Sequence, residues 1–140
     1  MESEEPNIED RYRTLLFSWF GVSMSVVFLL FITFAPVQTT TTNQMLSVIL
    51  NCAGIIPVGA SFLLKQQVLA QAISEQKIDR VRKAYMLAFA LCEASALLAT
   101  VDHFVNGADF YYLGFVIALL GMLLHFPQNR HLLDASNQQM

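Results

Sequence analysis

The sequence predicts an all-α protein of one domain, a polytopic membrane protein built as a bundle of four transmembrane helices. Apolar residues make up 55% of the 140 residues and charged residues only 14%, whereas soluble proteins average about 45–50% and about 25%. The charged residues also gather in three segments, 2–13, 65–83 and 130–134. Between them lie apolar runs close to the roughly 20 residues that a helix needs to cross a bilayer. The predicted spans are about 14–35, 45–64, 84–105 and 110–126.

The basic residues predict the orientation of the four spans. All eight Lys and Arg residues lie before the first span, between the second and third, or after the fourth, and the other two links contain none. Cytoplasmic loops carry an excess of Lys and Arg. We therefore expect a cytoplasmic arm at 1–13, a cytoplasmic tail at 127–140, and a multi-pass protein of the cell membrane with both termini inside.

The first span has the composition of a helix that faces lipid. It contains several Phe residues and Trp19, follows Tyr12, and ends at Pro36. Trp and Tyr favour the interface between membrane and water. The link at 38–44 is uncharged and rich in Thr, which fits a turn. It offers neither the carboxylates nor the basic residues that a metal or a phosphate would need.

The second span contains a proline that should bend it. Pro57 cannot donate a backbone hydrogen bond, so it frees the carbonyl of Ala53. In lipid that carbonyl needs a partner. Two interpretations are open: a kink packed within the bundle, or polar backbone presented to the third span. Apolar residues recur at helical spacing beyond the span, which predicts that the helix leaves the membrane and turns near 74–78.

The third and fourth spans carry faces of small residues, which favour close helix packing. In the third span a small residue recurs every four positions, at Ala84, Ala88, Cys92, Ala96 and Thr100. Gly114, Ala118 and Gly121 give the fourth span a similar face. The two cysteines lie in apolar segments without a CxxC spacing, so neither a zinc site nor a disulfide framework is indicated.

Glu93 is the one carboxylate near the middle of a predicted span. It lies about 13 Å from the start of the span at 1.5 Å per residue, close to the midplane. A carboxylate at that depth is costly unless it is protonated, paired or facing a cavity. We expect a protonated Glu93 at the level of Pro57, where it would donate to the Ala53 carbonyl. Asn51 and Thr100, nearer the external end, are candidate secondary ligands.

The run at 85–94, Tyr-Met-Leu-Ala-Phe-Ala-Leu-Cys-Glu-Ala, resembles the second helix of the proteolipid (c) subunit of rotary ATP synthases. The match lies in the pattern Phe-Ala-Leu-x-Glu-Ala and in the distance of Glu93 from a basic link. The resemblance implies a helical hairpin with a cytoplasmic basic link. It also implies that Glu93 binds and releases a proton or a sodium ion.

Two classes of function remain open on these residues. In the first, the chain is a structural or interaction subunit of a membrane complex, and Glu93 pairs with a partner helix or stabilises the bundle. In the second, the chain handles protons or cations, with Glu93 as the ion site. Either class implies the lipid bilayer as surroundings and a second copy or other membrane subunits as partners.

An enzyme is not expected, because no phosphate loop, nucleophile elbow or HExxH motif is present. No cofactor is implied. Asp102, His103 and Asp109 form a conceivable external metal or acid–base site, although polar residues at a helix end are more often interfacial anchors. A net charge of −3 without a basic block argues against nucleic acid as a partner.

Overall fold

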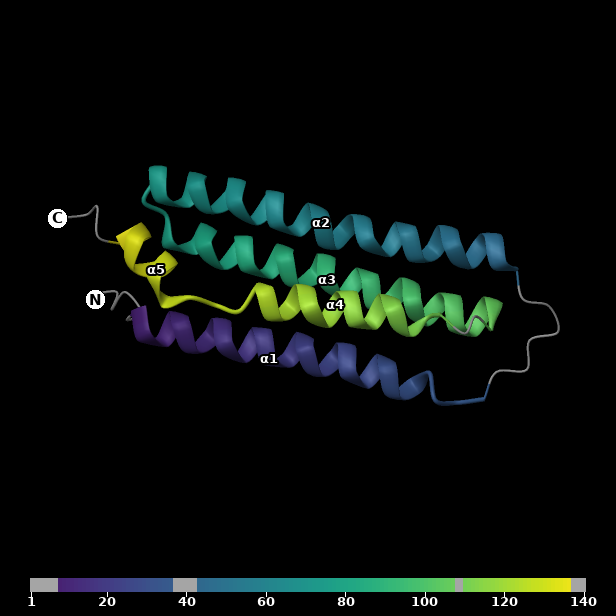
Figure 1. The fold of residues 1–140 in the computed structure, drawn as a ribbon. Coiled ribbons are helices and arrows are strands. Elements are labelled where there is room, and N and C mark those ends of the chain that lie inside the picture. Colours follow the sequence, from purple (N-terminus) through teal and green to yellow (C-terminus); the bar gives the residue numbers. More distant parts are fainter. Residues whose placement is uncertain (1–7, 37–42, 108–109, 137–140) are drawn as a thin grey trace.

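The described residues, 8–36, 43–107 and 110–136, form five α-helices in a computed structural model of the chain. Four of them lie side by side in an elongated bundle (Figure 1). The start of α1, the turn between α2 and α3, and α5 lie together at one end of the bundle, and α3 is followed by α4 at the other. The helices are α1 (Ile8–Ile32), α2 (Gln44–Ser74), α3 (Ile78–Asn106), α4 (Tyr112–Leu124) and α5 (Asn129–Ser136).

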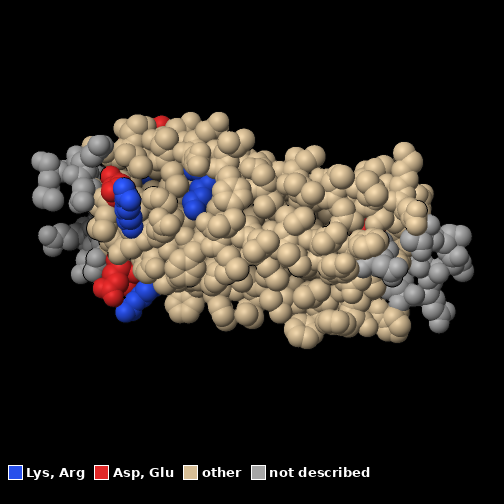
Figure 2. All heavy atoms as spheres, in the orientation of Figure 1, with Lys and Arg blue, Asp and Glu red and all other residues tan. Residues whose placement is uncertain are grey.

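Charge is concentrated at the end of the bundle that carries the α2–α3 turn, which we call the basic end. On the face drawn in Figure 2, the Lys and Arg side chains all lie toward this end and the rest of the surface is almost uncharged. The long uncharged sides are apolar: large hydrophobic residues such as Phe17, Phe28, Ile56 and Leu63 are more than half exposed. A continuous apolar surface of this extent is typical of a contact with lipid or with another protein.

Three of the helices are long and apolar enough to cross a membrane: α1, α2 and α3. The predicted fourth span, 110–126, contains a helix that is shorter than the prediction. Its helix, α4, has 13 residues, which is about 20 Å at 1.5 Å per residue against about 30 Å of hydrocarbon. The helix does not continue through Pro127, because proline and the residue before it disfavour helical backbone. Counted with α5, at a bend of 45°, the segment makes a fourth candidate span.

The two terminal segments take part in the bundle where they are described. α1 begins at Ile8, inside the segment expected to be a solvated arm. In the expected tail, α5 buries Leu132 and Ala135 in the same core cluster as Leu15. Burial of these side chains explains why a helix with so few apolar residues is held in place.

The α2–α3 hairpin turns where the apolar spacing predicts it, since α2 ends at Ser74 and α3 begins at Ile78. Lys77 Nζ donates a hydrogen bond to Glu75 Oε2 (3.0 Å), and Arg80 lies 2.5 Å from Oε1. The hydrogen bond from Lys77, helped by the charge of Arg80, lowers the pKa of Glu75. The turn is therefore held by charges at the surface.

Helices α1 and α3 run parallel and in register, although α2 separates them in sequence. Three contacts join residues that are 68 positions apart, two of them between the helices and the third from α3 to Ala35, just after the end of α1. They are Arg11–Asp79 (2.7 Å), Ser25–Glu93 (2.5 Å) and a longer contact from His103 to the Ala35 carbonyl (3.5 Å). We call this line of contact the α1–α3 seam.

Small residues let α3 approach its neighbours closely. Ala84, Ala88, Cys92 and Ala96 of the expected ridge are buried, as are Gly114 and Ala118 of α4, whereas Thr100 is half-buried. A Cβ at Gly114 would lie 2.6 Å from the Cβ of Ala99. The two helix backbones could not be this close with a larger residue at either position.

Candidate functional site

The Glu93 carboxyl lies on α3 and joins it to α1. Ser25 Oγ donates a hydrogen bond to Glu93 Oε1 at 2.5 Å, and the pair is part-buried. Ser25 lies at the same level as Glu93 because the two helices are parallel and their contacts keep a constant offset of 68 residues. A hydrogen bond from a hydroxyl to a carboxyl oxygen satisfies one of the polar groups that would otherwise be costly in an apolar environment.

The expected bond from Glu93 to the Ala53 carbonyl is replaced by this contact with α1. On α3, the residue that faces α2 at this depth is Ser95: its Oγ would lie 3.2 Å from a Cβ at Gly54. Glu93 and Ser95 are two positions apart, or about 200° around a helix of 3.6 residues per turn. Glu93 is therefore turned away from α2. Pro57 lies inside α2, which continues through it as one helix.

A second carboxyl, Asp102, is completely buried between α2 and α3, with no exposed side-chain surface. Ser47 Oγ and Asn51 Nδ2 donate to its Oδ2 at 2.7 and 3.0 Å. Asn106 Nδ2 donates to its Oδ1 at 3.3 Å. All three donors are neutral and both carboxyl oxygens accept. The arrangement suits a carboxylate that is stabilised by hydrogen bonds rather than by a cation.

The Asp102 cluster also closes the first turn of α2. The backbone N–H of Asn43 donates to Asn106 Oδ1 (2.5 Å), and Asn106 Nδ2 returns a bond to the Asn43 carbonyl (2.7 Å). The Asn43 side chain accepts from the N–H of Leu46 (3.2 Å). The first N–H groups of a helix have no partner of their own, and negative charge is favourable beside them. The last turn of α3 thus caps the start of α2.

The sequence did not identify Asp102 as a core residue. We expected it at an interface or in an external site with His103 and Asp109, but it lies inside the helix pair. His103 packs against Tyr111 instead, with the rings tilted by 51° and 4.4 Å between their centroids, and Asp109 lies outside the described residues. Within the described residues, no group of three or more His, Cys, Asp or Glu could hold a metal ion.

The expected secondary ligands of Glu93 have other partners. Asn51 is bound to Asp102, and Thr100 donates to the carbonyl of Ala96 in its own helix (2.9 Å). A signal for Asp102 was present in the spacing of polar residues on α3. Tyr85, Cys92, Ser95, Asp102 and Asn106 follow steps of seven and three or four, which place them on one face.

Further polar contacts tie the helices together nearer the basic end. His125 Nε2 lies 2.7 Å from Ser61 Oγ and joins α4 to α2. Trp19 Nε1 donates to the Met122 carbonyl (2.8 Å) and joins α1 to α4. Tyr85 lies 2.6 Å from a ring nitrogen of His131, which joins α3 to α5. Polar side chains thus link α4 to both α1 and α2, and α3 to α5.

The chain matches no protein-family model, and comparisons with curated proteins and with solved structures give no match either. The class of protein therefore follows from the structure alone. It is an all-α protein with three helices, or four if α4 and α5 form one bent span, that are long and apolar enough to cross a membrane.

Proposed function

We propose that the chain is a non-catalytic integral membrane protein of the structural or interaction class, with Glu93 as a buried protonatable group that holds α1 on α3. Its surroundings are the lipid bilayer, and its partners are a second copy or other subunits of a membrane complex. No enzymatic role and no cofactor form part of the proposal.

One observation carries the proposal: both carboxyl groups within the apolar helices have hydrogen-bond partners in the chain itself. Glu93 is bonded to Ser25 of α1, and Asp102 to two residues of α2 and one of α3. Such bonds stabilise a helix pair, because their loss would leave polar groups unsatisfied in an apolar environment. A group that carries ions must also release them, and a hydrogen bond to a neighbouring helix opposes release.

The proposed topology has four spans with both termini and the α2–α3 turn on the cytoplasmic side of the cell membrane. α4 and the residues around it, 110–126, form the fourth span. The support is the charge distribution, since all eight Lys and Arg residues belong to the segments assigned to the cytoplasm.

The variants Glu93→Gln and Glu93→Leu test the structural role. Gln keeps a carbonyl oxygen for the Ser25 hydroxyl, so we expect normal folding, normal recovery of co-purifying membrane subunits, and no change in proton flux of liposomes. Leu removes the acceptor, so we expect a less stable protein. A Glu9→Gln variant is the matched control, because Glu9 is exposed and pairs with Arg13 of its own helix. Loss of a proton flux in Glu93→Gln with unchanged stability would refute the structural role.

Proton or cation handling is the second candidate. Two observations favour it: the Glu93–Ser25 pair is only part-buried, and the helix around Glu93 resembles the ion-binding helix of the proteolipid subunit. A carboxyl at the edge of a helix pair is reachable from the outside, whereas one sealed in the core is not. On this alternative, Glu93 binds and releases the ion, and Ser25 is its neighbour.

A hydrophobic carbodiimide separates the two candidates, because it reacts with protonated carboxyl groups that it can reach. The ion-site candidate requires labelling of Glu93 at pH 6–8 and protection by the transported cation. Asp102, sealed in the same helix, serves as an internal control that should not react. Absence of labelling at Glu93, together with an unchanged flux in Glu93→Gln, would exclude the ion site.

A further inference from the structure

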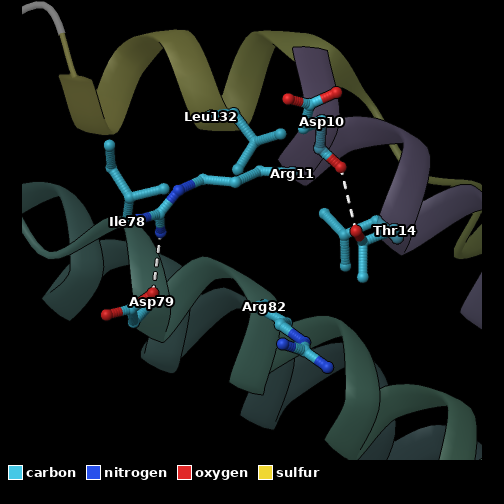
Figure 3. A pocket seen from close by; sticks show the side chains of 8 residues that line it. Asp10, Arg11, Thr14, Ile78, Asp79, Arg82 and Leu132 are labelled. Carbon is cyan, nitrogen blue, oxygen red and sulfur yellow. Dashed lines mark hydrogen bonds and ion pairs between the residues drawn. The ribbon is translucent and has the colours of Figure 1, made fainter. Parts of the chain in front are cut away.

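We propose that the basic end of the α1–α3 seam binds the phosphate of an anionic phospholipid. The site is a cavity of about 200 Å³ between α1, α3 and α5. Figure 3 shows its walls. Arg11 reaches across from α1 to Asp79, Leu132 of α5 covers one side, and Thr14 and Arg82 lie along the other.

The cavity is lined by two acidic residues, Asp10 and Asp79, and two basic ones, Arg11 and Arg82. Asp79 is neutralised by Arg11, at 2.7 Å. The Asp10 carboxylate points away from Arg82 (Figure 3). Among the described residues no ion pair is made by Arg82 or by Lys83 next to it, and Lys83 lines an adjoining hollow together with Arg82. Arg82 in the cavity and Lys83 in the adjoining hollow are thus left to meet a phosphate, and an arginine can bind two of its oxygens at once.

The depth of the cavity matches a lipid headgroup. Thr14 stands at the start of the first apolar run, and Arg82 stands two residues before the third run begins. Below this level the surface becomes apolar at once: Phe17 and Met86 are exposed one turn further on. A phosphate at Arg82 would therefore have hydrocarbon contacts directly beneath it, as a phospholipid needs and a free anion does not. Basic pockets between membrane helices on the cytoplasmic side are known to bind acidic headgroups.

Native mass spectrometry of the full-length protein, titrated with phosphatidylglycerol or phosphatidylcholine, tests the proposal. We expect tighter binding of phosphatidylglycerol, and a loss of about fivefold in its affinity for each of Arg82→Gln and Lys83→Gln. Arg82→Lys should recover part of the affinity. Arg130→Gln is the matched control: it removes a charge from the same end, outside the cavity, and should leave binding unchanged.

Three results would overturn the proposal. Equal affinity for the two lipids would show that no acidic headgroup is recognised. Unchanged binding in the Arg82→Gln, Lys83→Gln double variant would place the lipid elsewhere. Competition by inorganic phosphate as strong as by phosphatidylglycerol would identify a site for free anions. All substituted side chains are exposed, so an unaltered unfolding midpoint can be required before each titration.

Discussion

At the scale of single residues, Asp102 and Glu93 show two ways to place a carboxyl among apolar helices. Asp102 is sealed and accepts three hydrogen bonds from side chains on two helices. Glu93 accepts one, from a third helix, and stays at the edge. The stability of the helix pair should therefore depend more on Asp102, and any exchange with the surroundings on Glu93.

Replacing Asp102 by Ala should lower the free energy of unfolding by about 1–3 kcal/mol, because the buried Ser47 and Asn106 and the half-buried Asn51 would lose their common acceptor. Reversible denaturation in mixed micelles measures the change. Asp134→Ala is the control, since Asp134 is exposed and pairs only with Arg130 of its own helix; its effect should stay within about 0.5 kcal/mol. Equal stability of the two variants would contradict a structural role for Asp102.

Glu75 should titrate below the usual range of a glutamate, because Lys77 and Arg80 stabilise its ionised form. A pKa that is lower in the folded than in the unfolded state stabilises the fold above the unfolded pKa. That contribution is lost as the pH falls through the folded pKa. Chemical-shift titration of the Glu75 carboxyl checks the direction. In Lys77→Gln its pKa should rise, and an unchanged value would mean that Lys77 is not the cause.

At the scale of helices, α3 is the element that every other helix contacts. It meets α2 through a polar face, α4 through small residues and α1 through Glu93. The small-residue spacing of this helix was visible in the sequence, because packing needs it every turn. The partner of Glu93 was not visible, because a parallel helix 68 residues earlier leaves no local pattern.

Two glycine substitutions should distinguish packed from open helix faces. Gly114→Ala would place a Cβ 2.6 Å from Ala99, so α4 must shift, at a cost of about 1–3 kcal/mol. Gly59→Ala meets nothing within 4 Å and should stabilise α2 by about 0.5–1 kcal/mol. Unfolding of both variants in the same micelles provides the comparison. A Gly114→Ala protein as stable as Gly59→Ala would mean that α4 does not pack here.

At the scale of the whole molecule, hydropathy was sufficient to predict an all-α chain with several helices able to cross a membrane. Hydropathy did not predict where the last membrane helix ends. There, Pro127 ends the helix. The segment that follows has the composition of a polar tail, but the burial of Leu132 holds it as a short packed helix. The buried Asp102 cluster was missed for a related reason: polar residues near a helix end look alike whether they face a neighbour or water.

Cysteine labelling from outside the cell should test the proposed topology. Single cysteines placed after Pro36 and at the exposed Phe110 should react with an impermeant maleimide, whereas cysteines at Gln76 and Asn129 should react only after permeabilisation. The Lys and Arg distribution is the reason for this direction. Reaction at Gln76 in intact cells would invert the topology.

The constant offset of 68 residues along the α1–α3 seam has a consequence for the timing of synthesis. Ribosomes add about 5–20 residues per second, so α1 is complete about 3–14 s before the matching turn of α3 emerges. During that interval Ser25 has no carboxyl to bond. The α1–α3 pair therefore joins a newly made helix to one that was completed several seconds earlier.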